Sequence, residues 1–372
     1  MKKAIIMTAI ILSISVVSAL FVIGCGSASS SGGNGGSVTW IDYMYAVNTG
    51  TSKTTAYLIE SSGALTTLEG SPFSTGVVPR SAAVLQARKL YYVASIATHD
   101  IAGYLINAQG SLEAISGFPT AAGNQPISIA SHPNGNFLYV VNQIDETVSS
   151  YSINSDGTLT SLESSPTATC SVPARAAIHP SGSTLYVPNA DSANISAYKI
   201  ETDGSLTTLE ASPFPTDTDP RSVAIVPSGD YLYCANRSTH KISCYSIDEN
   251  GSLEALAGSP FAADGAHPTD LAVDPGGKFL FAANGNSSNV SVFAIAGDGS
   301  LSYISGSPFA AGEAPTSVTI DPSGKYVYVT NWDDDNISAY SIGSGGALIT
   351  VEGSPFAASG SPDFGAVFRA YQ

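Results

Sequence analysis

Charged side chains, and basic ones above all, are scarce in this sequence. Of its 372 residues, 14 are lysine or arginine and 30 are aspartate or glutamate, about half of the charged share usual for a soluble domain. The formal net charge is therefore −16. Nucleic-acid binding draws its affinity from clustered lysine and arginine, so this charge balance argues against nucleic acid as a partner.

Cysteine is rare as well, and the motifs of common cofactors are missing. The four cysteines form no CxxC pair and no Cys/His spacing typical of zinc, and the sequence contains no GxSxG or CxxCH motif. It predicts no cofactor. Cys234 and Cys244 lie on two predicted neighbouring strands joined by a short loop, which allows a cross-strand disulfide or, alternatively, two buried thiols.

Only one apolar run is long, and it lies near the start of the sequence. Lys2 and Lys3 precede an apolar stretch that ends in Val-Ile-Gly-Cys, with Cys25 last. This is the arrangement of a bacterial lipoprotein signal, and an ordinary membrane anchor or another cleavage site is the alternative. We expect a signal peptide at 1–24, a lipidated Cys25 with a Gly/Ser tether at 25–37, and a folded domain at 38–372. The lipid would hold the protein to a membrane of the cell envelope, at the outer membrane or cell surface.

Glycine and proline, by contrast, are plentiful, with 36 and 21 residues, and they punctuate a repeat. One tetrapeptide recurs at intervals of 47 or 48 residues, at Tyr45–Asn48, Tyr92–Ser95, Tyr139–Asn142, Tyr186–Asn189, Tyr233–Asn236, Phe281–Asn284 and Tyr328–Asn331. A period near fifty with strand-like content is typical of propeller blades. The sequence therefore predicts an all-β, seven-bladed β-propeller with four-stranded blades.

The last repeat shows the expected strands of one blade. They are strand A at 315–322, strand B at 325–331, strand C at 336–342 and strand D at 347–352, and Ser354-Pro355-Phe356 then leads to the next blade.

The two ends of the chain predict how the ring closes. The first repeat begins at strand B, whereas residues 361–368 resemble an unpaired strand A after the last strand D. We expect this C-terminal segment to complete the first blade, which hides the edges that an open array would expose.

The repeat resembles a known family. The Tyr-Val-Thr-Asn unit, with Pro-x-Ser-x-x-x-x-Pro-x-Gly before it and Asp-Gly-x-Leu after strand C, is similar to the YVTN-repeat and lactonase group of seven-bladed propellers, which includes 6-phosphogluconolactonase. The resemblance covers 38–372 and implies lactone hydrolysis by a histidine near the start of a strand A, with arginine and acidic groups nearby. The matching positions, none of them histidine, are Arg80, Ile127, Ala174, Arg221, Thr269, Thr316 and Asp363.

Residues that differ between repeats gather in loops predicted to share one rim. Strand alternation places the D-to-A and B-to-C loops on the same side, where ligand sites of propellers usually lie. Arg80 and Arg221 are suited to hold a carboxylate or phosphate, unless they pair with Asp219, Asp363 or another acid of the rim. The ligand-binding candidates are Arg80, Arg221, His240, Trp332 and Asp363.

Catalytic candidates are His267, Asp270 and Arg221. A histidine beside an aspartate has the composition of a general base and its orienting carboxylate, as hydrolysis requires. His267 precedes Pro268 in a loop, so an exposed loop histidine is the alternative.

Asp333, Asp334 and Asp335 follow Trp332 and offer oxygen ligands suited to calcium. Their spacing lacks the alternation and the glycine of known calcium loops. We therefore predict no metal site and keep these aspartates as weak candidates.

Two functional hypotheses remain from the sequence. The first is a membrane-anchored lipoprotein that binds an envelope protein, a glycan or a small molecule without catalysis, because the blades are nearly uniform and the family histidine is missing. The alternative is a lactonase that acts on a sugar lactone, because the resemblance covers the whole folded domain.

Overall fold

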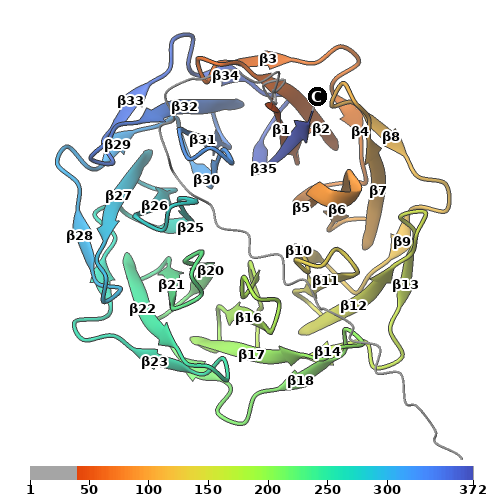
Figure 1. Ribbon diagram of the computed structural model, residues 1–372, viewed down its shortest axis with the longest axis horizontal. Helices are drawn as coiled ribbons and strands as arrows, with labels where there is room; N and C mark the ends of the chain where they lie inside the picture. Colours follow the sequence, from red (N-terminus) through yellow and green to blue (C-terminus); the bar gives the residue numbers. More distant parts are fainter. Residues whose placement is uncertain (1–39, 372) are drawn as a thin grey trace, which may run out of the picture. The chain divides into compact units, whose positions relative to one another are not determined.

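The repeat folds into seven antiparallel sheets that surround a central axis (Figure 1). The structure is a computed structural model and describes residues 40–371. The predicted signal peptide, Cys25 and the tether lie outside this range, and the expectations about them remain predictions. The seven sheets confirm the predicted seven-bladed propeller. Within residues 40–371 no helix is long and apolar enough to cross a membrane.

Each blade has four strand positions, counted outward from the axis, as the seventh blade shows. Its strands are β30 (Pro315–Ile320), β31 (Tyr326–Asn331), β32 (Asn336–Ile342), β33 (Leu348–Thr350) and β34 (Phe356–Ala357). The expected strand D is in fact two short strands, because β33 and β34 both pair with β32. Phe356 continues this pairing, so the Ser-Pro-Phe motif does not yet lead away from the blade. At the break, the Ser354 hydroxyl accepts a hydrogen bond of 2.9 Å from the Ala339 N–H.

The other six blades repeat this order. The inner strands are β35 (Pro362–Tyr371), β5 (Pro79–Leu85), β10 (Pro126–Ser131), β15 (Ala177–Ile178), β20 (Pro220–Ile225) and β25 (Pro268–Val273). The second strands are β1 (Trp40–Asn48), β6 (Leu90–Ser95), β11 (Phe137–Asn142), β16 (Thr184–Asn189), β21 (Tyr231–Asn236) and β26 (Phe279–Asn284). A short 3-10 helix, η1 (Gln86–Arg88), joins β5 to β6.

The third and outermost strands complete these six sheets. The third strands are β2 (Lys53–Ile59), β7 (Asp100–Ile106), β12 (Thr147–Ile153), β17 (Asn194–Ile200), β22 (Lys241–Ile247) and β27 (Asn289–Ile295). The split outer strands are β3 (Leu65–Thr67) with β4 (Phe73–Ser74), β8 (Leu112–Ala114) with β9 (Thr120–Ala121), β13 (Leu159–Ser161) with β14 (Thr167–Ala168), β18 (Leu206–Thr208) with β19 (Phe214–Pro215), β23 (Leu253–Ala255) with β24 (Phe261–Ala262), and β28 (Leu301–Tyr303) with β29 (Phe309–Ala310).

The repeated tetrapeptide provides the packing between blades. Tyr45 is fully buried, and its hydroxyl donates a hydrogen bond of 2.8 Å to the carbonyl of Gly110 in the next blade. The amide of the closing asparagine bonds within its own blade, as Asn331 does to the Ser338 hydroxyl at 2.9 Å. Alternate strand residues thus fill the space between sheets, where buried aromatic area stabilises the ring.

The C-terminal strand closes the ring, as predicted. β35 pairs with β1 along its length, with Ala366 opposite Tyr45. Arg369 also donates to both carboxylate oxygens of Asp42, each at 2.6 Å, which is the bidentate geometry that makes such pairs strong. The first blade is therefore completed by residues from the opposite end of the described chain.

The possible disulfide between Cys234 and Cys244 does not form, and the alternative of two buried thiols is confirmed. The register of β21 and β22 places Cys234 opposite Ser243 and Cys244 opposite Tyr233, so the two side chains point to opposite faces of the sheet. Both cysteines are buried free thiols. Burial raises the pKa of the Cys234 thiol to about 12 and also raises that of Cys244.

Candidate functional site

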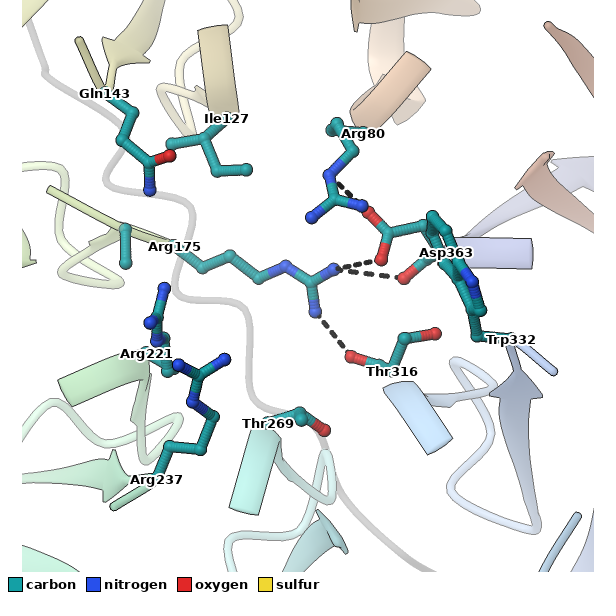
Figure 2. A pocket seen from close by; sticks show the side chains of 11 residues that line it. Arg80, Ile127, Gln143, Arg175, Arg221, Arg237, Thr269, Thr316, Trp332 and Asp363 are labelled. Atoms are coloured by element: carbon teal, nitrogen blue, oxygen red, sulfur yellow. Dashed lines mark hydrogen bonds and ion pairs between the residues drawn. The ribbon is translucent and has the colours of Figure 1, made fainter. Parts of the chain in front are cut away.

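In every blade a proline stands at or shortly before the inner strand, and the residue after that proline lies near the ring axis. These seven residues line one cavity of about 350 Å³ together with Gln143, Arg175, Arg237 and Trp332 (Figure 2). They are Arg80, Ile127, Ala174, Arg221, Thr269, Thr316 and Asp363. Because every blade contributes a residue, the cavity is at a mouth of the central channel. In blade five the pairing of β20 with β21 shifts between Pro220 and Ser222, a bulge that frees Arg221 from the regular ladder.

Four of the six arginines in the sequence line this one cavity. On one side, Arg221 and Arg237 share Asp219, whose two carboxylate oxygens lie 2.6 and 2.8 Å from the respective Nε atoms. Burial alone would raise the pKa of Asp219, but a hydrogen bond from Ser238 and the two guanidiniums hold it below its ordinary value. Burial and the nearby charge of Arg237 lower the pKa of Arg221. This side of the cavity therefore favours a further negative charge.

On the opposite side, Arg80 lies between an acid and an aromatic ring. Its Nε is 3.3 Å from Asp363 Oδ2, and its guanidinium carbon is 5.3 Å from the centre of the Trp332 ring. Stacking of this kind fixes the plane of an arginine. The Nη atoms of Arg80, Arg221 and Arg237 donate no hydrogen bond to any residue within 40–371. Three guanidiniums thus present free donors to the cavity.

Arg175 forms the floor of the cavity, and sequence reasoning missed it. Its Nη1 donates to the Thr316 carbonyl at 2.7 Å and its Nη2 to the Asp363 carbonyl at 3.0 Å (Figure 2). The same guanidinium lies 3.6 Å from Asp270 Oδ2 and 3.4 Å from Asp363 Oδ1. It also packs 5.3 Å from the centre of the Phe364 ring. Arg175 therefore ties blade four to blades one, six and seven.

A signal for Arg175 was present in the repeat. The third residue of the Pro-x-x segment is serine in four blades, at Ser81, Ser128, Ser222 and Ser317. The three exceptions are Arg175, Asp270 and Phe364, and Arg175 contacts both of the others. A second cavity of about 300 Å³ lies on the other side of Arg175, and its lining includes these four serines. Arg175 borders both cavities.

Comparison with known proteins agrees with this architecture. A family model described as lactonase, seven-bladed β-propeller, matches residues 98–264, 208–308 and 256–361, which together span well over half of the chain. The chain belongs to the lactonase propeller family. No protein with a curated description matches its sequence.

Solved structures share the fold of this lactonase propeller. A 6-phosphogluconolactonase candidate from Bacteroides uniformis has a TM-score of 0.76 at 19% identity, over 88% of this chain and 99% of that one. Another from Bacteroides fragilis has a TM-score of 0.76 at 17% identity, over 89% and 98%. The periplasmic gluconolactonase of Pseudomonas aeruginosa has a TM-score of 0.74 at 16% identity, over 89% and 99%. At these identities the likeness establishes the fold alone.

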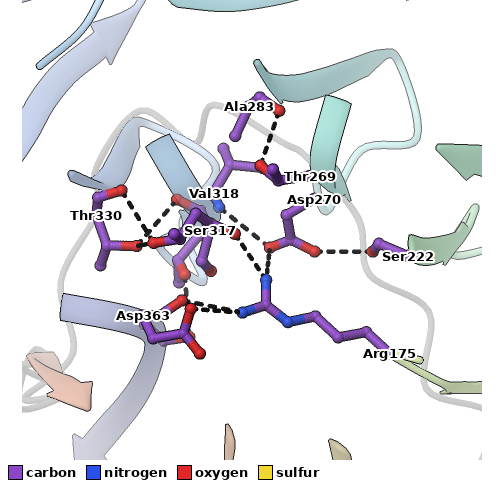
Figure 3. A network of polar contacts seen from close by, with 12 residues as sticks. Arg175, Ser222, Thr269, Asp270, Ala283, Ser317, Val318, Thr330 and Asp363 are labelled. Atoms are coloured by element: carbon purple, nitrogen blue, oxygen red, sulfur yellow. Dashed lines mark hydrogen bonds and ion pairs between the residues drawn. The ribbon is translucent and has the colours of Figure 1, made fainter. Parts of the chain in front are cut away.

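The predicted pair of His267 and Asp270 does not form in this lactonase propeller. Asp270 points toward the axis, where it accepts hydrogen bonds from the Ser222 hydroxyl at 2.7 Å and the Val318 N–H at 3.2 Å (Figure 3). His267 instead stacks on His240, with ring centres 5.0 Å apart. Burial and the neighbouring His240 and Arg237 lower the pKa of His267. The general-base pairing is therefore wrong, because the bulge after Pro268 separates the two side chains.

His240 serves the joint between blades and does not line either axial cavity. Its Nδ1 accepts a hydrogen bond of 3.0 Å from the His267 N–H, and His99 does the same for the Gln125 N–H at 3.1 Å. The structure thus places Arg80, Arg221, Trp332 and Asp363 in one cavity and leaves His240 outside it.

Two of the three aspartates after Trp332, Asp334 and Asp335, cap loops. Asp334 Oδ2 accepts a hydrogen bond of 2.8 Å from the Glu313 N–H, and Asp335 Oδ1 accepts one of 2.6 Å from the Ser361 N–H. No group of three or more histidine, cysteine, aspartate or glutamate side chains within residues 40–371 is arranged to hold a metal ion.

Proposed function

We propose that this protein hydrolyses a lactone of a sugar acid that carries an anionic group, with the axial cavity as its active site. One observation carries the proposal: four arginines converge on a single cavity in a chain of net charge −16, and three of them have free Nη donors. Family membership supplies the reaction class. The names of the fold neighbours, gluconolactonase and 6-phosphogluconolactonase, suggest an aldonic acid lactone with or without a phosphate.

Arg221 and Arg237 are suited to the anionic group. Their Nε atoms are held by Asp219, so their Nη ends are oriented before a ligand arrives. Planar guanidiniums bind phosphate and carboxylate through paired hydrogen bonds, and each charge-assisted hydrogen bond contributes about 1.5–3 kcal/mol. The wall that these residues form would therefore select anionic lactones over neutral ones.

Arg80 and Asp363 are suited to the chemical step. Asp363 is 3% exposed, and its Oδ2 accepts no hydrogen bond of good geometry from residues 40–371. In the proposed reaction this carboxylate takes a proton from water as the water oxygen bonds to the lactone carbonyl carbon. The carbonyl oxygen becomes negative and accepts hydrogen bonds from the Arg80 Nη groups. The ring C–O bond then breaks, and the proton passes from Asp363 to the departing ring oxygen.

In this proposal Asp363 takes the role of general base that the family resemblance assigns to a histidine. None of the seven positions where a family histidine was expected holds one, and Arg221 and Asp363 are two of the residues found there. A non-catalytic scaffold, the first hypothesis from the sequence, ranks second, because the family match favours hydrolysis.

The test is hydrolysis by the purified full chain, measured as lactone loss above the buffer rate. The substrates are glucono-δ-lactone, its 6-phosphate and a glucaric acid monolactone, whose anionic group is a carboxylate. Asp363→Asn is expected to lower kcat about 10²–10⁴-fold, as loss of a general base does. The double variant R221Q/R237Q is expected to raise KM for the anionic lactones, with KM for the neutral lactone nearly unchanged.

The matched control is Lys278→Gln, which removes one positive charge from the turn at the far end of an inner strand. It should leave all rates unchanged. Hydrolysis no faster than buffer for every lactone would refute the proposal, and equal rates in the Asp363→Asn variant would place the reaction elsewhere.

A further inference from the structure

Blade two departs from the repeat at four positions that lie together. The tetrapeptide ends in serine, Ser95, where the other six blades have asparagine. Ala102 stands where the others have serine or threonine, and Gly103 stands where the others have a larger residue. Phe118 replaces the serine that precedes proline in every other blade. The changes at Ser95, Ala102 and Gly103 remove side-chain volume, and those at Ser95, Ala102 and Phe118 remove a hydrogen-bonding group.

Blade five shows what the usual residues do. There the Thr216 hydroxyl lies 3.2 Å from the side-chain amide of Asn236 and 3.0 Å from the Ser243 hydroxyl. The Ser259 hydroxyl accepts a hydrogen bond of 2.8 Å from the Cys244 N–H. Hydrogen bonds of Asn236, Ser243 and Ser259 thus connect the third strand to the break in the outer strand and to the loop that enters the blade.

In blade two these partners are missing. Thr75 is the counterpart of Thr216, and Ser95 and Ala102 replace its two partners. The hydroxyl oxygens of Thr75 and Ser95 are buried and have no hydrogen-bond partner within residues 40–371. A buried hydroxyl without a hydrogen-bond partner destabilises the fold, so two such groups in one place require an explanation.

A cavity of about 230 Å³ occupies this place, and we call it the blade-two pocket. Its polar lining includes Thr75 and Asp100, and its apolar lining includes Tyr104, Ile115, Phe118 and Pro119. A side chain at Gly103 would overlap the ring of Phe118, so this glycine is needed for the ring to sit there. By the volume of liquid water the pocket holds about seven waters, which is room for a small molecule.

We propose that the blade-two pocket binds a small organic ammonium. Asp100 is its only charged lining residue, so the pocket attracts a cation and repels anions. Thr98 donates to Asp100 Oδ1 at 2.8 Å, which leaves Oδ2 without a donor within residues 40–371. An ammonium group has three N–H donors and no acceptor, which suits a carboxylate and an unpaired hydroxyl. The apolar walls then contact the carbon chain.

This inference does not depend on lactone hydrolysis. The blade-two pocket and the axial cavity share no lining residue. The proposed ligands also have opposite charge. Failure of one proposal therefore leaves the other intact.

The test is calorimetric titration of the full chain with n-butylammonium chloride, with n-butanol and sodium butyrate as neutral and anionic probes of equal chain length. We expect saturable binding of butylammonium at least tenfold tighter than that of butanol, and no binding of butyrate. Asp100→Asn should weaken butylammonium binding about 10- to 100-fold, through loss of a charge-assisted hydrogen bond. Glu113→Gln, an exposed carboxylate in the same blade, is the matched control and should bind like the wild type.

The double variant S95N/A102S restores the residues that the other blades use. It should fold, because five other blades carry this pair and blade one carries Asn48 with Thr55. It should also unfold at a temperature no lower than the wild type while losing butylammonium binding. Equal binding of butanol and butylammonium, undiminished binding in the double variant, or no saturable binding of butylammonium would each overturn the proposal.

Discussion

Replacing Arg175 with serine, the residue that four other blades carry at this position, tests the role of the buried ion network. The Arg175 side chain is 15% exposed, and its partners Asp270 and Asp363 are 8% and 4% exposed. Removing one member of such a group leaves buried charge uncompensated, at a cost of about 3–5 kcal/mol. For 332 described residues the unfolding entropy is about 0.7 kcal/mol/K, so Tm should fall by about 4–7 °C.

Urea and thermal unfolding of a double-mutant cycle measure this effect. The cycle combines Arg175→Ser with Asp270→Ser and should give a coupling free energy of at least about 1 kcal/mol, because the two side chains share one network. Lys199→Ser is the control: it breaks the exposed pair with Glu201 at 2.8 Å and should cost less than about 1 kcal/mol. Additive costs in the cycle, or a Tm within 1 °C of the wild type for Arg175→Ser, would refute the reasoning.

Two further predictions concern ring closure and acid stability. Deleting 362–372 removes the strand that pairs with β1, so the variant should lose cooperative unfolding and associate on size-exclusion chromatography; an unaltered monomer with wild-type Tm would contradict ring closure. The pKa of Asp219 is lower in the folded protein, so the stability that it contributes is present above its unfolded pKa of about 3.9 and is lost as pH falls through the folded value. Asp219→Asn should therefore be less stable than wild type at pH 7, and the gap in urea midpoint should close as pH falls below about 4; a gap independent of pH would contradict this.

The architecture could be predicted because it repeats locally. Side-chain alternation, turn glycines and a fixed period identify blades without knowledge of long-range contacts. The split of the outer strand could not be predicted in this way. In six blades it is accompanied by a hydrogen bond from a backbone N–H to a serine hydroxyl 15 positions later, as from Ala339 to Ser354, and in blade two it forms without one.

The candidate site could be predicted in part. Arg80, Arg221, Trp332 and Asp363 were expected at one mouth of the ring, and they line one cavity. Arg175 was not expected because the predicted site rests on the residue directly after the first proline of each repeat's inner segment, whereas Arg175 is the second residue after Pro173.

The two pairings that do not form, Cys234 with Cys244 and His267 with Asp270, have one cause, the register of neighbouring backbone segments. Because Asn236 pairs with Lys241, the residue opposite Cys234 is Ser243, and Cys244 lies one position further along the strand. His267 has a positive φ of 58° at the rim and Asp270 follows a bulge, so closeness in sequence does not bring these side chains together. Register and bulges are set by the pairing of strands in the assembled sheet, and no local sequence motif predicts them.

The most direct test of the central claim is the kcat/KM of the full chain for 6-phosphoglucono-δ-lactone relative to glucono-δ-lactone, in wild type and in R221Q/R237Q. The account predicts that the wild type prefers the phosphorylated lactone by at least tenfold and that the variant loses this preference while it still hydrolyses the neutral lactone. A preference that survives in the variant, or no hydrolysis of either lactone above the buffer rate, would contradict it.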